Sequence, residues 1–165
     1  MKSTVVILHN IRSLHNVGSI FRTADGAGIS KMFLTGITPG PIDRFGSYRK
    51  QITKVSLGAE KNMPWEYHRL ASHVIKKLKR EGYAIFALEQ SKKSIPYNKI
   101  PKSKLRNKKI CLIVGNEVKG IPSSVLKTAD RILEIPMNGN KESLNVSVAF
   151  GIAVYELMKN VKVKN

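Results

Sequence analysis

The sequence predicts one α/β domain with a mainly parallel sheet and its own hydrophobic core, and three observations support these parts of the prediction in turn. Short apolar runs typical of buried strands alternate along the chain with segments of helical periodicity. No internal repeat or linker interrupts the 165 residues, so we expect one domain over residues 1–165. Hydrophobic residues make up 42% of the chain, which is enough for a core that needs no disulfide or metal.

The first half of the chain supplies two predicted strands and one helix. Residues 4–8 are β-branched or apolar throughout, as in a buried strand, and residues 31–35 form a second run of this kind. Between them, Asn16 is a suitable N-cap for the helix that follows it, and Gly28 stands where a C-terminal glycine is expected. Residues 39–54, rich in Gly, Pro and basic side chains, predict a loop.

The second half continues the alternation. Its predicted elements are, in order, a basic-faced helix over 69–80 stopped by Gly82, a strand over 83–88, a basic loop over 90–109, a strand over 110–114, a short helix over 122–129 and a strand over 131–135. Strands that alternate with helices in this way favour parallel pairing.

The last helix is predicted to begin at Ser143 and to continue to Met158. It is apolar on almost every side, which is typical of a buried helix, yet it starts with the polar residues Ser143, Asn145 and Ser147. A helix N-terminus has free backbone N–H groups that favour a polar ligand. The alternative is that Ser143 and Asn145 only cap the helix.

Four polar loops are expected to meet at one edge of the sheet, because the carboxyl ends of parallel strands share an edge and ligands collect there. These loops contain Asn16 and Arg22, Glu89 and Gln90, residues 115–120, and residues 137–145. Residues 115–120 lack the Lys-Ser/Thr ending of a P-loop, and no G-x-G-x-x-G follows the first strand. A nucleotide-hydrolysing or nicotinamide-dependent enzyme is therefore poorly supported.

Charge is the strongest compositional signal. The chain has 29 Lys and Arg against 11 Asp and Glu, a formal net charge of +18. Such an excess predicts attraction to a polyanion, and a solvated basic surface without a partner is the alternative.

The cysteine, the histidines and the lengths of the apolar runs indicate which classes of protein are not expected. The single cysteine, Cys111, lies in an apolar run and excludes an intrachain disulfide, and the four histidines have no metal-ligand spacing, so no metal is expected. No run of transmembrane length or signal-peptide pattern is present, so we expect a soluble, cytoplasmic protein.

Three segments together resemble the motifs of the SpoU (TrmH-type) RNA ribose methyltransferases. Residues 16–22 (NVGSIFR) match N-x-G-x-x-x-R, residues 115–120 (GNEVKG) resemble the second motif, and residues 135–137 (IPM) with 143–149 (SLNVSVA) resemble the third. The motifs occur in the family's order and span the domain.

This resemblance implies a SPOUT fold with a C-terminal deep trefoil knot, S-adenosylmethionine as methyl donor, and an obligate homodimer. A knot would not be expected from the pattern alone. The resemblance places the donor in the knot, against Leu88, Gly115, Asn116, Glu117, Gly120, Ile135, Met137, Ser143 and Leu144.

The resemblance also implies a catalytic set of Arg22, Asn16, Glu117, Ser143 and Asn145. We expect Arg22 to hold an RNA phosphate and to stabilise the forming 2′-alkoxide, because arginine is too basic for an ordinary general base. The structural alternatives are a surface pair of Arg22 with Asp25, a simple N-cap at Asn16 and a solvated carboxylate at Glu117.

The leading hypothesis is an S-adenosylmethionine-dependent RNA 2′-O-ribose methyltransferase that acts on tRNA, with rRNA as the second substrate class. A non-catalytic RNA-binding protein of the same fold and a basic structural protein of the ribosome or nucleoid are the alternatives. Membranes and DNA are not expected partners. Because the first strand begins at Thr4, we expect no N-terminal RNA-binding extension, and assign RNA recognition to the basic loops 39–54 and 90–109 and the tail 159–164.

The homodimer interface is expected to include the final helix. Ser143, Ser147 and Gly151 have i,i+4 spacing and would form a strip of small residues that another helix can approach.

Overall fold

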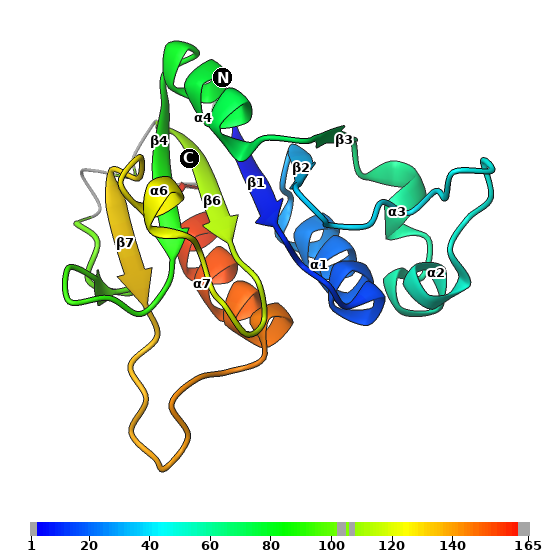
Figure 1. The fold of residues 1–165 in the computed structure, drawn as a ribbon. Coiled ribbons are helices and arrows are strands. Elements are labelled where there is room, and N and C mark those ends of the chain that lie inside the picture. The colour runs from blue at the N-terminus through cyan, green and yellow to red at the C-terminus, as the bar shows by residue number, and fades with distance from the viewer. Residues whose placement is uncertain (1–2, 102–104, 106–107, 162–165) are drawn as a thin grey trace.

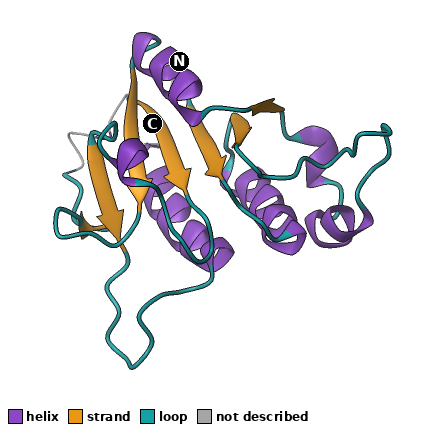
Figure 2. Ribbon diagram, in the orientation of Figure 1, coloured by secondary structure: helices purple, strands orange, loops and turns teal. Residues whose placement is uncertain are grey.

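The computed structural model describes residues 3–101, 105 and 108–161, which form a seven-stranded sheet with helices on both faces (Figures 1 and 2). The strand order is β3-β2-β1-β6-β4-β7-β5, and every pair is parallel. The strands are β1 (Thr4–His9), β2 (Lys31–Thr35), β3 (Trp65–His68), β4 (Tyr83–Leu88), β5 (Ile95–Pro96), β6 (Lys109–Val114) and β7 (Arg131–Glu134). The predicted fold class is confirmed.

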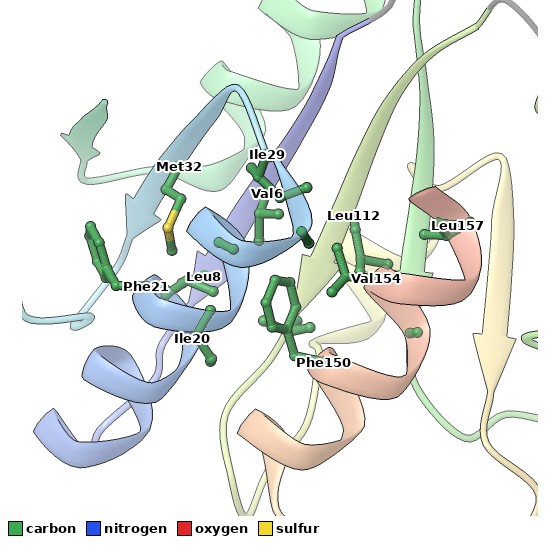
Figure 3. Close-up of a cluster of buried hydrophobic side chains, with 14 of the residues drawn as sticks. Val6, Leu8, Ile20, Phe21, Ile29, Met32, Leu112, Phe150, Val154 and Leu157 are labelled. Atoms are coloured by element: carbon green, nitrogen blue, oxygen red, sulfur yellow. The ribbon is translucent and has the colours of Figure 1, made fainter. Parts of the chain in front are cut away.

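Two apolar layers, one on each face of the sheet, follow from the alternation of side chains along each strand. On β1, Val6 and Leu8 belong to the layer under helices α1 (Leu14–Ala27) and α7 (Val146–Val161) (Figure 3). Val5 and Ile7 belong to the opposite layer, under α4 (Ala71–Arg80) and α6 (Ser123–Leu126). Because both faces are covered, the strands read as continuous apolar runs.

Helix α1 begins two residues before Asn16, so the prediction of Asn16 as its N-cap is wrong. Ser13 is the N-cap, with extended backbone, and its hydroxyl accepts a hydrogen bond from the Asn16 backbone N–H at 3.2 Å. The apolar pattern that starts at Val17 hid this earlier start. Gly28 ends the helix as predicted, with a φ of 77°.

The prediction of one loop over residues 39–54 is only partly right. Helix α2 (Lys50–Ser56) occupies its end and is followed by α3 (Ala59–Asn62) and the edge strand β3, which the sequence did not reveal. Helix α2 is short and buries only Ile52 and Ser56, so its periodicity was too weak to recognise.

The second half of the chain follows the prediction closely. Helix α4 starts two residues later than expected, α6 is shorter than the predicted segment 122–129, and the loop 90–109 contains the short edge strand β5. Within that loop, residues 102–104 and 106–107 lie outside the described residues, as does the predicted basic tail from residue 162 onward.

The final helix α7 begins at Val146, not at Ser143 as predicted. Asn145 caps it, because its Oδ1 accepts the Ser147 backbone N–H at 2.8 Å and its carbonyl accepts the Ala149 N–H at 2.9 Å. Ser143 belongs to the preceding loop.

The structure also bears on membrane spans, metal sites and the single cysteine. Over the part of the chain that the structure describes, no helix has the length and apolarity required to cross a bilayer. Within the same residues, no group of three or more His, Cys, Asp or Glu side chains is placed to hold a metal ion. Cys111 is buried in the sheet, and this burial raises the pKa of its thiol.

Candidate functional site

A cavity of about 240 Å³ opens at the carboxyl ends of the adjacent strands β6, β4 and β7. Its walls come from the ends of these strands, from residues 114–120 and from the segment between β7 and α7. The structure brings all nine residues of the predicted donor site to this cavity, namely Leu88, Gly115, Asn116, Glu117, Gly120, Ile135, Met137, Ser143 and Leu144.

Two glycines allow the backbone to fold tightly around the cavity. A Cβ on Gly115 would lie 2.5 Å from Ile121 Cγ1 and 2.7 Å from the Gly120 carbonyl carbon. Gly120 has a φ of 65°, and a Cβ there would lie 2.2 Å from Glu89 Oε2. Only residues without a side chain fit at these positions, and the wall of the cavity near them is therefore backbone.

Asn116 fixes the shape of the 115–120 loop. Its Oδ1 accepts the backbone N–H groups of Val118 and Lys119 at 3.0 and 2.8 Å, while its Nδ2 donates to the Asn10 carbonyl at 2.7 Å. Asn116 and Gly120 also exchange backbone hydrogen bonds at 3.2 and 3.0 Å. The loop is thus tied to the end of β1.

Glu117 connects this loop to the start of α1. Its carboxylate accepts the backbone N–H of Arg12 at 3.0 Å, that of Ser13 at 2.9 Å and the side-chain Nδ2 of Asn16 at 3.0 Å. Burial alone would raise the pKa of Glu117, but these hydrogen bonds outweigh it and leave the pKa below its ordinary value. Glu117 is therefore ionised at neutral pH and is not the freely solvated carboxylate of the alternative interpretation.

Asn16 and Asn145 extend the same network to the final helix. An ionised carboxylate can only accept, so Asn16 turns its Nδ2 toward Glu117 and its Oδ1 toward Asn145, which donates to it at 3.1 Å. Asn16 is only 6% exposed. Three of the five predicted catalytic residues thus form one hydrogen-bonded chain, and Ser143 lines the cavity beside it.

Arg22 does not line the cavity; it lies on an exposed strip of α1. On one side of this strip Gly18 faces α2, where an added Cβ would be 2.7 Å from the Ile52 carbonyl oxygen. On the other side Gly26 faces α7, where an added Cβ would be 3.1 Å from the Tyr155 hydroxyl. Helical spacing places Arg22 between these two contacts. The Arg22 side chain therefore projects from α1 between α2 and α7.

The alternative explanation of Arg22 as half of a surface ion pair is not realised. Among the ion pairs between described residues, none joins Arg22 to Asp25. The guanidinium remains available to bind an anion.

Two further carboxylates reach the cavity. Glu89, which the sequence places in a polar loop, accepts the backbone N–H groups of Gln90 and Ile121 on its carboxylate at 3.0 and 2.8 Å. Glu134, at the end of β7, was missed, and it accepts the Ser94 hydroxyl at 2.7 Å. With Glu117 they outnumber the lysine of the cavity wall, Lys119, so the formal charge of the lining is negative within a chain of net charge +18.

Comparison with known proteins decides the family. A model of the SpoU rRNA Methylase family matches residues 3–155. The chain belongs to this family.

Curated SpoU relatives are RNA methyltransferases by name. The chain is 30% identical over 161 residues to the tRNA (guanosine(18)-2′-O)-methyltransferase of Aquifex aeolicus, covering 96% of this chain and 70% of that protein. It is 34% identical over 155 residues to the 23S rRNA (guanosine(2553)-2′-O)-methyltransferase of Bacillus subtilis, covering 93% of this chain and 57% of that protein. The chain therefore spans only part of the length of these relatives.

Solved structures confirm the fold of this SpoU chain. An AdoMet-bound rRNA methyltransferase from Sinorhizobium meliloti matches with a TM-score of 0.84 at 28% identity, over 95% of this chain and 56% of that one. The A. aeolicus TrmH/SpoU tRNA modifying enzyme matches with a TM-score of 0.81 at 28% identity, over 97% and 76%. The predicted family and SPOUT sheet architecture are confirmed, while the deep knot and the single domain over 1–165 stay predictions.

Proposed function

We propose that the protein is an S-adenosylmethionine-dependent RNA 2′-O-ribose methyltransferase. The observation that carries this proposal is the hydrogen-bonded chain Glu117–Asn16–Asn145, which links all three SpoU motifs and begins at Glu117 in the cavity wall. A protein that had kept only the fold for RNA binding would have no need to hold these polar side chains together.

The cavity suits S-adenosylmethionine in charge and shape. The donor carries a sulfonium and an ammonium group, and Glu89, Glu117 and Glu134 supply negative charge around it. The glycine-lined wall at Gly115 and Gly120 leaves backbone groups open to the adenosine. When bound, the donor supplies a methyl group on sulfur that is already activated for transfer.

The residues of this chain then act on the RNA ribose. Arg22 holds a phosphate next to the target nucleotide and stabilises the 2′-oxygen as negative charge develops on it. The proton of the hydroxyl passes to that phosphate or to a transiently neutral Arg22. Asn16, held by Glu117, and Asn145 with Ser143 position the ribose.

The substrate is proposed to be RNA, with tRNA as the leading class and rRNA as the second, because curated relatives carry both names. We propose the cytoplasm as the protein's site of action. A non-catalytic RNA-binding role is the alternative that the following experiment would reveal.

Donor binding and methyl transfer test the proposal directly. We expect S-adenosylmethionine to bind the wild-type chain in calorimetry, and its tritiated methyl group to enter RNA that lacks the modification. Gly115→Ala should weaken donor binding by about tenfold or more, because its Cβ overlaps Ile121 and Gly120. Gly139→Ala is the matched control, since an added Cβ there meets nothing within 4 Å. RNA binding without donor binding by the wild type would favour the non-catalytic alternative.

We also propose a homodimer that forms on α7, although the strip predicted for it must be revised. Ser143 precedes the helix, and Gly151 already faces Thr23 of α1 in the same chain, 3.7 Å from an added Cβ. Instead, Val148, Ile152 and Tyr155 are 51%, 37% and 56% exposed and share one face of α7. A contiguous exposed apolar stripe of this kind favours association, and a second copy is the occupant proposed here.

Light scattering should give the mass of a dimer for the wild type at micromolar concentration. Val148→Glu combined with Ile152→Glu should give a folded monomer, because two charges would be desolvated in the interface. Leu70→Glu, at an exposed apolar position before α4, should remain dimeric. A monomeric wild type would contradict this prediction.

A further inference from the structure

The loop over residues 41–49, which joins β2 to α2, is a closed and internally bonded turn. The Asp43 carboxylate accepts the backbone N–H groups of Phe45 and Ser47 at 2.8 and 3.0 Å, and the Asp43 N–H donates to the Ser47 carbonyl at 2.9 Å. Ile42 and Tyr48 pair as an antiparallel bridge below the tip. The tip is therefore pre-shaped and loses little conformational freedom on binding.

This turn presents aromatic rings to solvent. Phe45 at its tip is 77% exposed and Tyr48 is 46% exposed. The Arg44 guanidinium lies 4.7 Å from the Phe45 ring centroid, and Lys61 Nζ lies 5.6 Å from that of Tyr48. The fold gains little from a phenylalanine at this position, because its ring packs into neither apolar layer.

The surroundings of the turn are positively charged. Residues 39–62 contain five Lys or Arg and two acids, and both acids are used inside the protein. Asp43 closes the turn, and Glu60, only 3% exposed, accepts the Ser56 hydroxyl and the Gly58 N–H. Positive charges therefore outnumber negative ones on the exposed surface around Phe45, where Asp43 is the part-buried acid and Glu60 is buried.

The turn also lies on the side of the molecule that carries Arg22. It leads directly into α2, which packs against α1 at Gly18, one helical turn before Arg22. In Figure 1 this segment projects from the sheet beyond α2. An RNA strand that is bound by Arg22 and extends toward α2 would run toward this turn.

We propose that this turn is a base-stacking element, in which Phe45 stacks on an unpaired base of the RNA that Arg22 binds and the cation of Arg44 lies close to the phosphates. The inference rests on the proposed function and specifies how the substrate is recognised. An aromatic ring with adjacent cations is the usual means of binding single-stranded nucleic acid, and bases in a duplex offer no free face to it. A protein interface would instead bury a broad patch whose centre is depleted of charged residues, whereas the Phe45 ring lies against the Arg44 guanidinium.

Fluorescence anisotropy with a short labelled oligouridylate and an RNA duplex of equal length tests this inference. Phe45→Ala should weaken single-strand binding roughly 5- to 150-fold, the range of one lost base–aromatic stack. Phe45→Leu should be nearly as weak, whereas Phe45→Trp should bind like the wild type. Ile37→Ala, which shortens another side chain that is 65% exposed, serves as the control and should change nothing. Duplex binding, the salt dependence of affinity and calorimetric donor binding should be the same in all variants.

Three results would overturn the inference. Wild-type affinity of Phe45→Ala or Phe45→Leu for the single strand would exclude stacking while leaving the proposed methyltransferase intact. An equal loss on single strand and duplex would indicate a general defect of the surface. Failure of the wild type to bind either RNA would overturn this inference together with the proposed RNA substrate, and donor calorimetry would then test what remains of the function.

Discussion

Arg22→Ala is expected to abolish methyl transfer while leaving donor affinity unchanged. Loss of one preorganised group that stabilises developing charge commonly costs about 10²–10³ in rate, and more when the group also positions the nucleophile. The donor cavity is not affected because Arg22 does not line it. Arg22→Lys should also be poor, since an ammonium cannot reproduce the planar, bidentate contact with phosphate. Tritiated-methyl transfer and calorimetry measure the two effects separately.

The matched control is Arg80→Ala. It removes the same charge from an exposed arginine at the end of α4, before β4 and hence near the opposite edge of the sheet. Its transfer rate should stay close to that of the wild type. Near-normal transfer by Arg22→Ala would refute the proposed mechanism even though the family assignment would stand.

Glu117→Ala is expected to cause the largest loss of stability among single substitutions at the site. It leaves the N–H groups of Arg12 and Ser13 and the amide of Asn16 without their acceptor. Hydrogen bonds to a charged group contribute about 1.5–3 kcal/mol each, and partial solvation of the released donors reduces the total, so the free energy of unfolding should fall by about 3 kcal/mol. Methyl transfer should fall as well, because Asn16 is released. Denaturant unfolding gives the first effect and the transfer assay the second.

The pH dependence of this loss distinguishes a carboxylate effect from a packing effect. The pKa of Glu117 in the folded protein lies below its ordinary value of 4.5, so its ionised form stabilises the fold above that pH. That stabilisation is lost as the pH falls through the folded-state pKa, and the stability difference between wild type and Glu117→Ala should shrink accordingly. Glu142→Ala removes the charge of an exposed loop residue and should show little effect. A difference independent of pH down to acid conditions would contradict the assigned role.

Much of the fold was predictable because the sheet is buried on both faces. Strands such as residues 110–114 then read as continuous apolar runs, and their alternation with helices indicates parallel pairing. The edge strand β3 escaped prediction because its polar residues, Glu66 and His68, alternate with aromatic ones; Glu66 pairs with both His68 and Lys31. Residues 65–68 form a strand because they pair with the neighbouring strand β2, and this pairing is not visible in the sequence.

The residues of the candidate site were predictable as a set, but their geometry was not. The three motifs predict Asn16, Glu117 and Asn145 as site residues. The hydrogen bonds among them depend on how the folded chain brings three distant loops together. Glu134 carries no sequence signal, because its place at the cavity follows from the register of β7 against β4 and β5. Asn16 was misjudged as a cap for a related reason: Ser13 caps α1, which leaves the Asn16 side chain to the site.

The hydrogen bonds of Asn16 to Glu117 and Asn145 span 101 and 129 positions of the chain. Contacts between such distant residues form late in folding, because the intervening chain must be ordered first. During synthesis Asn145 and α7 leave the ribosome after all the strands of the sheet. The first motif is thus made long before its last partner exists, and an unfinished chain lacks the complete hydrogen-bonded network. The three-residue network is therefore complete only in a molecule in which α7 has been translated and has docked against the sheet.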